Sequence, residues 1–154
     1  MTQVYLALYK GYSSEKGVKA WVGRLKEWLV RKMTRGIYSH CEIAVKRSDG
    51  LFCCRSASLR DGGVREKVMP LPSEKWDLIP LKAAVADGAV NLMERTARGK
   101  YDYLGALGTV SIKGGDKNKW FCSEWCGEAL GIAEPWRFSP NDLAVICAVG
   151  KVGF

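Results

Sequence analysis

Residues 37–58 read IYSHCEIAVKRSDGLFCCRSAS, in which two β-rich runs flank the turn sequence Ser48-Asp49-Gly50. An Asp-Gly step between such runs is a strong hairpin signal, so we predict antiparallel strands at 37–47 and 51–58. Side chains alternate between the two faces of a strand. On the first strand this alternation predicts one face with Cys41, Ile43 and Val45 and the other with His40, Glu42 and Ala44. The hairpin therefore carries the single histidine of the chain on a strand.

The length of the hairpin loop decides how the two strands pair. If Asp49-Gly50 forms a two-residue loop, Arg47 pairs with Phe52. If Ser48-Asp49-Gly50 forms a three-residue loop, with its glycine in the left-handed bulge position, Arg47 pairs with Leu51. We favour the three-residue loop because a left-handed glycine at the end of the loop suits that turn.

The loop length also decides which side chain of the second strand lies near His40. In the two-residue register Glu42 faces Ala57, and Arg55 shares the His40 face. In the favoured register Glu42 pairs with Ser56, which then lies diagonal to His40. We predict that the Ser56 hydroxyl accepts or relays a hydrogen bond that orients the imidazole. Glu42 is the nearby charge that favours the imidazolium.

Hydrophobic periodicity and turn residues predict the other elements. Strands are expected at 4–9, at 76–81 and around 145–149. Helices are expected over 18–33, over 82–98 and from Cys122 to Leu130, with a short helix or turn at 102–110. Gly131 is a natural stop for the helix that opens near Cys122. This placement predicts that Cys122 lies at a helix N-terminus.

The composition is that of an ordinary globular protein, with 47% hydrophobic and 26% charged residues among 154. This length suits one domain, so we expect a single unit over 1–154. No stretch approaches the roughly 18–20 apolar residues that cross a bilayer, and the N-terminus lacks the features of a signal peptide. We therefore expect a cytoplasmic protein whose six cysteines are reduced thiols. The cysteine spacings do not match zinc knuckles, so no metal and no cofactor is expected.

The formal net charge is +8, which raises the local concentration of anions such as nucleic acid, anionic lipid or acidic cell-wall polymer. The basic residues are spread along the chain without a nucleic-acid-binding motif, so no specific nucleic-acid partner is expected. The helix at 18–33 combines an apolar stripe with basic residues on its other faces. We interpret it as a core-packed helix with a solvated face. The alternative hypothesis is weak attraction to an anionic membrane or a teichoic-type polymer.

A cysteine is a nucleophile as its thiolate, and a helix N-terminus stabilises that anion through unpaired backbone N–H groups and the helix dipole. Cys122 is predicted to occupy such a position, one turn before Cys126. Four cysteines fall in apolar strand patterns and are interpreted as small core residues: Cys41, Cys53, Cys54 and Cys147. Since the chain has one histidine, any imidazole base for Cys122 must be His40.

Five short motifs follow one another along the chain. They are YSHCEIAV at 38–45, GGVR at 62–65, YDYLGALG at 101–108, WFCSEWCGEALG at 120–131 and SPNDLA at 139–144. In this order they resemble the circularly permuted papain-like amidases, which are related to the NlpC-type cell-wall peptidases and the lecithin-retinol acyltransferases. In the permuted members the histidine strand precedes the cysteine helix, as His40 precedes Cys122 here. The compact form also resembles versions associated with bacteriophage genomes, which would act in the host cytoplasm or from the virion.

The resemblance implies a role for each matching residue. Cys122 matches the nucleophile and His40 matches the base. Three further matches are candidate substrate contacts, an acidic position in the cysteine helix and two tyrosines near the cleft: Glu124, Tyr101 and Tyr103. Many members carry a Glu or His as a third polar residue on the strand after the histidine strand. This chain departs from that pattern, because residues 55–58 read RSAS.

The resemblance implies an α+β permuted papain-like fold, in which an antiparallel sheet packs against the helix that bears the nucleophile. The expected activity is cleavage of an amide or ester bond through a Cys122 thioester, with His40 as general base. The expected substrate is a peptide crosslink of the cell wall, an isopeptide or a lipid acyl bond. Two alternatives stay open, an acyltransferase with the same dyad and an inactive binding or virion module with this fold. The oligomeric state is also open.

Overall fold

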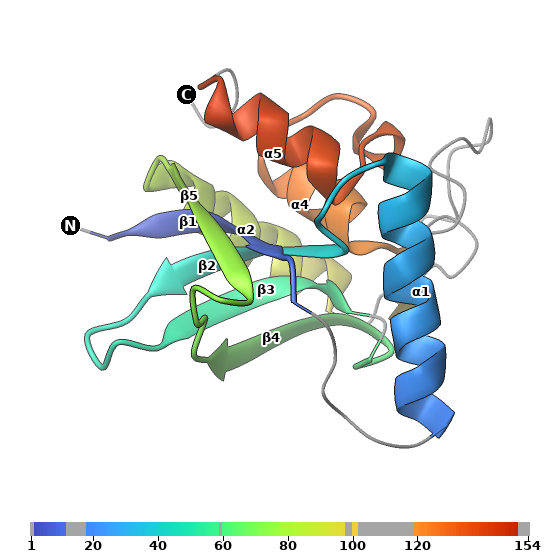
Figure 1. Cartoon of the computed structure of the whole chain (residues 1–154). Coiled ribbons are helices and arrows are strands. Elements are labelled where there is room, and N and C mark those ends of the chain that lie inside the picture. Colours follow the sequence, from blue (N-terminus) through green and yellow to red (C-terminus); the bar gives the residue numbers. More distant parts are fainter. Residues whose placement is uncertain (1, 12–17, 59, 98–99, 102–118, 151–154) are drawn as a thin grey trace.

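The computed structural model describes residues 2–11, 18–58, 60–97, 100–101 and 119–150, and within them the architecture is α+β (Figure 1). One sheet has the strand order β5-β1-β2-β3-β4-β6-β7. Its strands are β1 (Val4–Tyr9), β2 (His40–Lys46), β3 (Phe52–Ser58), β4 (Gly63–Met69), β5 (Trp76–Leu81), β6 (Lys100–Tyr101) and β7 (Lys119–Trp120). Neighbouring strands run antiparallel except for the short β6 and β7, which pair in parallel.

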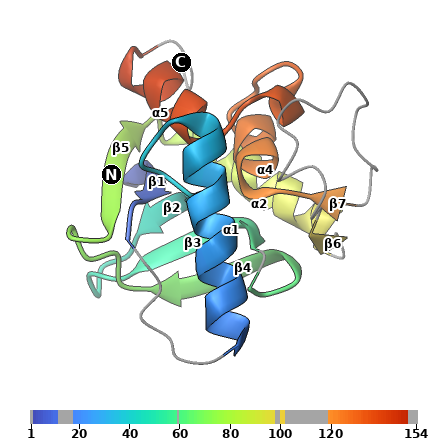
Figure 2. The same ribbon diagram turned by 45° about the vertical axis from the view of Figure 1, so that its right-hand side comes forward.

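The helices of the described residues form two groups. They are α1 (Val18–Thr34), α2 (Ala84–Thr96), α4 (Cys122–Ala129) and α5 (Pro140–Ala148), with a 3₁₀ turn η1 at Pro135–Arg137. Helices α2, α4 and α5 lie together on one face of the sheet, whereas α1 stands apart from them along the end of the strands (Figures 1 and 2). The expected antiparallel sheet with a helix that starts at Cys122 is therefore present.

The central strands are buried on both faces. On one face, apolar side chains of α2, α4 and α5 join those of the sheet in the main core, where Trp125, Leu6 and Ile43 are fully buried. The indole N–H of Trp125 donates to Thr96 Oγ1 at 2.9 Å, so this buried donor is satisfied. On the other face a smaller cluster consists of Ala7, Ala44, Phe52, Cys54 and Leu71. A polar side chain on these strands is consequently buried and needs a partner.

The predicted hairpin and its favoured register are confirmed. Val45 pairs with Cys53, and the Arg47 N–H donates to the Leu51 carbonyl at 2.8 Å across the loop. Gly50 has φ +81°, the left-handed conformation that the three-residue loop requires. The predictions at 4–9, at 76–81, over 82–98 and from Cys122 are also confirmed, as β1, β5, α2 and α4.

The prediction of a strand around 145–149 is wrong, because most of this segment belongs to α5. A capping box sets the start of the helix: Asp142 N–H donates to Ser139 Oγ at 3.2 Å, and Ser139 N–H donates to the Asp142 carboxylate at 2.8 Å. The buried residues Leu143 and Cys147 then follow the helical spacing of four. Apolar content without alternation was the misleading signal.

Two further differences concern β4 and the segment 102–110. Strand β4 is not predicted by the hydrophobic pattern, because it contains the polar run Arg65, Glu66 and Lys67. The predicted short helix or turn at 102–110 lies outside the described residues.

The interpretation of the helix at 18–33 as core-packed is also wrong. Three of its apolar side chains, Trp21, Leu25 and Trp28, are exposed in α1. The search of the described helices for one long and apolar enough to cross a bilayer finds none.

Candidate active site

Cys122 is the first residue of α4, as predicted. Phe121 before it has extended backbone angles (φ −111°, ψ 163°) and provides no side-chain cap. The N–H groups of the first turn are therefore free of a side-chain cap, and together with the helix dipole they favour an anion at the Cys122 sulfur. The helix ends at Ala129, and Gly131 follows with φ +73°, the left-handed stop expected there.

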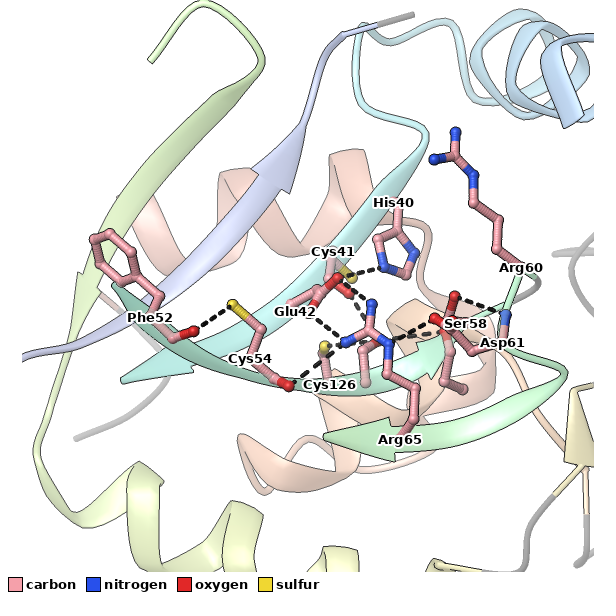
Figure 3. A network of polar contacts seen from close by, with 12 residues as sticks. His40, Cys41, Glu42, Phe52, Cys54, Ser58, Arg60, Asp61, Arg65 and Cys126 are labelled. Carbon is pink, nitrogen blue, oxygen red and sulfur yellow. Dashed lines mark hydrogen bonds and ion pairs between the residues drawn. The ribbon is translucent and has the colours of Figure 1, made fainter. Parts of the chain in front are cut away.

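A continuous chain of polar contacts runs from Cys122 through β2 to β4. His40, the first residue of β2, lies beside the Cys122 side chain, near enough for each group to shift the pKa of the other. Its Nε2 lies 3.0 Å from Oε1 of Glu42, so Nδ1 is the ring nitrogen left for Cys122. Arg65 of β4 donates two hydrogen bonds of 2.7 Å, one to each carboxylate oxygen of Glu42. Figure 3 shows His40 and Arg65 converging on Glu42 from opposite sides.

The electrostatics of this chain favour a thiolate beside an imidazolium. Burial lowers the pKa of His40, but the hydrogen bonds and negative charges of Cys122 and Glu42 outweigh it and raise this pKa to about 10. Burial raises the pKa of Glu42, yet the hydrogen bonds and positive charges of Arg65 and His40 lower it to about 2. Glu42 is thus ionised at neutral pH although its side chain is only 1% exposed.

The pKa of the Cys122 thiol is shifted in the opposite direction from that of its neighbour Cys41. A hydrogen bond from the Cys41 thiol, and then the positive charge and hydrogen bond of His40, lower the pKa of Cys122 well below its usual range against the effect of burial. Burial and the neighbouring sulfurs raise the pKa of Cys41, so Cys41 stays protonated as a donor. Cys41 is fully buried in the main core, as the strand pattern predicts.

The side chains of the dyad differ in exposure. The His40 side chain is 22% exposed, while Cys122 as a residue is 6% exposed. The indole ring of Trp76, on β5, stands edge-on to the His40 ring with 6.3 Å between centroids. The imidazole is thus held between Glu42, Cys122 and an aromatic wall, which restricts its rotation.

Ser56 does not orient His40, contrary to the prediction. The confirmed register, continued by one residue, sets Ser56 opposite Glu42. Its hydroxyl instead donates to the carbonyl oxygen of Cys41 at 2.8 Å and lies 3.8 Å from the Cys126 sulfur. The physical reason is that the Ser56 hydroxyl gives its proton to a backbone carbonyl, while His40 Nε2 is already held by Glu42. The carboxylate that holds the imidazole comes from the histidine strand itself.

Replacing Ser56 by alanine is therefore expected to affect stability and not the chemistry of His40. The loss of one buried hydrogen bond should cost about 1 kcal/mol of unfolding free energy. The pH dependence of Cys122 alkylation should stay that of the parent protein. Urea unfolding and iodoacetamide kinetics measure the two quantities. A displaced alkylation midpoint would mean that Ser56 acts on the imidazole after all.

Two of the three candidate substrate contacts, Glu124 and Tyr101, belong to described elements. Glu124 is buried in the first turn of α4, where a carboxylate also stabilises the helix N-terminus. The backbone of Tyr101 forms β6, which pairs Tyr101 with Trp120 of β7. Tyr103 lies outside the described residues.

Sequence reasoning missed the role of Arg65. The residue closes the motif GGVR, in which Gly62 takes φ +79° and β4 begins at Gly63. Pairing of β4 with β3 then sets Arg65 opposite Ser56, within reach of Glu42 one strand further. A second acid, Asp61, accepts from Arg65 Nε at 2.9 Å and fixes the guanidinium. The motif was a visible signal, but no local pattern indicates which carboxylate its arginine meets.

Comparison of the chain with protein-family models, with curated proteins and with solved structures finds no match. The interpretation of the site consequently depends on its geometry. The site has a buried thiol at a helix N-terminus with an imidazole beside it. Behind the imidazole lies a carboxylate, which an arginine holds.

Proposed function

We propose that this protein is a cysteine hydrolase that cleaves an amide or ester bond through a thioester at Cys122. The observation that carries the proposal is the hydrogen-bonded chain of Arg65, Glu42 and His40, with Cys122 beside the imidazole at the start of α4. It supplies a nucleophile, an acid-base group and a carboxylate that holds the acid-base group in place. These are the parts that thiol-dependent acyl transfer needs.

In the first half of the reaction the Cys122 thiolate attacks the substrate carbonyl carbon and a C–S bond forms. The oxyanion accepts a hydrogen bond from the backbone N–H of Cys122 at the start of α4. The His40 imidazolium then gives its Nδ1 proton to the leaving nitrogen or oxygen, and the C–N or C–O bond breaks. The enzyme is left as a thioester with a neutral imidazole.

In the second half, neutral His40 takes a proton from a water molecule as the water oxygen attacks the thioester. The C–S bond breaks, the carboxylic acid product leaves, and the thiolate–imidazolium pair is restored. Glu42 stays ionised throughout, because the positive charge of Arg65 stabilises its carboxylate. The carboxylate holds the imidazole through Nε2.

We extend the proposal to the permuted papain-like class. In support, the strand that carries His40 precedes the helix that carries Cys122, and an antiparallel sheet packs against that helix. The proposed substrates are those that the resemblance implies: a cell-wall peptide crosslink, an isopeptide or a lipid acyl bond.

The test is labelling with an activity-based acyl electrophile at neutral pH, followed by intact-mass analysis and peptide mapping. We expect a single label on Cys122, which should form faster than at any of the other five cysteines. The Cys122→Ala variant should take no label. Cys147→Ala is the matched control, because burial raises the pKa of the Cys147 thiol to about 11 and it lies outside the site. This control should label like the parent protein.

Three results would contradict the proposal in different ways. A label on Cys126 or Cys54 would assign the nucleophile elsewhere. Equal reactivity of Cys122 in the folded and the urea-denatured chain would favour an inactive binding module. A thioester that persists in water and turns over only with an added amine or alcohol would favour an acyltransferase.

A further inference from the structure

Helix α1 turns its apolar side outwards. Trp21, Leu25 and Trp28 recur at spacings of four and three, so they form one stripe on the helix surface. They are 58%, 47% and 49% exposed. Large apolar side chains in a row on a helix normally cover a protein core, and an exposed row marks an interaction surface.

Among the described side chains of α1, polar ones make hydrogen bonds to the rest of the protein. Glu27 accepts from Arg60, after β3, at 2.8 Å. Arg31 donates to the carbonyl oxygen of Gly11 at 2.6 Å and to the hydroxyl of Ser39 at 3.1 Å. These contacts hold the helix along the end of the strands, as Figures 1 and 2 show. Glu27 and Arg31 thus face the protein, while Trp21, Leu25 and Trp28 face outwards.

The exposed stripe continues into a basic hollow at the C-terminal end of α1. Ile37 is 59% exposed. A hollow of about 360 Å³ is lined by Lys10, Trp28, Arg31, Lys32, Gly36 and Ile37, three of which are basic and none acidic. The ammonium of Lys32 lies 4.7 Å from the centroid of the Trp28 ring, so a cation sits on the apolar stripe itself. We define the α1 surface as Trp21, Leu25, Trp28, Lys32 and Ile37.

We propose that the α1 surface docks on a lipid bilayer that contains anionic lipids. The apolar side chains would enter the headgroup region, where the amphipathic tryptophan ring is favoured, and Lys32 would meet lipid phosphates. The net charge of +8 favours an anionic surface. It disfavours a second copy of the chain, because two α1 surfaces face to face would bring their basic residues together.

Docking in this way would bring the candidate active site close to the bilayer. Ile37 precedes His40 by three residues, and Arg31 of α1 hydrogen-bonds Ser39, the neighbour of His40. The docking does not depend on the chemistry of Cys122. Its failure and the failure of the proposed hydrolase activity are therefore separate results.

The test is co-sedimentation of the full chain with vesicles of phosphatidylcholine alone and of phosphatidylcholine with phosphatidylglycerol, at low and at high salt. We expect binding to the anionic vesicles that weakens with salt. Trp21→Ala combined with Trp28→Ala should lower the partition coefficient by at least about tenfold, because two large apolar side chains are lost. Lys32→Glu should lower it by at least about fivefold.

Matched controls separate docking from general adhesion. Val145, on α5, is as exposed as Trp21 but lies outside the α1 surface, so Val145→Ala should bind like the parent protein. Cys122→Ala should also bind fully. Circular dichroism of each variant establishes that it is folded. Recovery of the parent protein in the supernatant, or equal binding by the double tryptophan variant, would overturn the proposal. A dimer without vesicles that the double variant abolishes would assign the surface to a second copy instead.

Discussion

Alanine in place of His40 is expected to slow acylation of Cys122 at neutral pH by at least about a thousandfold. In the proposed mechanism the imidazolium stabilises the thiolate and gives the leaving group its proton, and the variant would lose both effects. The thiol pKa should rise, because the positive charge beside Cys122 is gone while its burial remains. Burst kinetics with an activated ester measure acylation, and the pH dependence of iodoacetamide alkylation measures the thiol.

The variant Cys41→Ala is the matched control for this result. It removes the thiol that hydrogen-bonds Cys122 but leaves the imidazolium and its charge. We expect the alkylation midpoint to rise in this variant too, while acylation keeps its proton donor and loses much less rate than in His40→Ala. An alkylation profile unchanged by His40→Ala would show that the two side chains do not interact in solution. Equal rate losses in both variants would contradict the acid role of His40.

Glutamine in place of Glu42 is expected to lower the free energy of unfolding by about 3 kcal/mol at neutral pH, because Arg65 keeps its charge and loses its carboxylate partner. Urea unfolding of the parent and the variant measures the difference. The double variant Glu42→Gln with Arg65→Met should recover part of the loss, since the largely buried guanidinium charge is removed together with its partner Glu42. The carboxylate that then loses its arginine, Asp61, is 36% exposed and is stabilised by water. If the losses of unfolding free energy in the two single variants simply add in the double variant, a direct pairing of Glu42 with Arg65 is contradicted.

The same carboxylate predicts how stability depends on pH. Its pKa is about 2 in the folded protein, below its usual value of 4.5. Because this pKa is lowered on folding, ionised Glu42 contributes about 3 kcal/mol to the free energy of unfolding. This contribution is complete above pH 4.5 and is lost as the pH falls towards 2. The parent protein should lose stability across this window, and Glu42→Gln should lose correspondingly less. Equal acid sensitivity of the two proteins would contradict an ionised, paired Glu42.

Glu42→Gln should also change the pH profile of turnover. The carboxylate contributes to the raised pKa of His40, about 10, so its removal lowers that pKa. The alkaline side of the pH–rate profile, where the imidazolium loses its proton and turnover falls, should therefore move to lower pH. A purely structural role of Glu42 would change the rate without moving this side of the profile.

Local sequence patterns were sufficient for the parts of the site that depend on neighbouring residues. The register of β2 and β3 follows from Gly50, because the left-handed glycine fixes a three-residue loop and the side-chain period of two fixes the rest. The placement of Cys122 follows from a helical run that Gly131 ends. The choice of His40 as the proposed base followed from its being the single histidine of the chain.

The tertiary structure alone decided which groups surround that dyad. Arg65 meets Glu42 because β4 pairs with β3, and Cys41 meets Cys122 because α4 packs on β2. Long-range pairing and packing depend on the whole core, so no local pattern carries them. The direction that α1 faces is a similar case. Periodicity shows that a helix has an apolar stripe, but only the tertiary structure shows that Trp21, Leu25 and Trp28 face outwards while Glu27 pairs with Arg60.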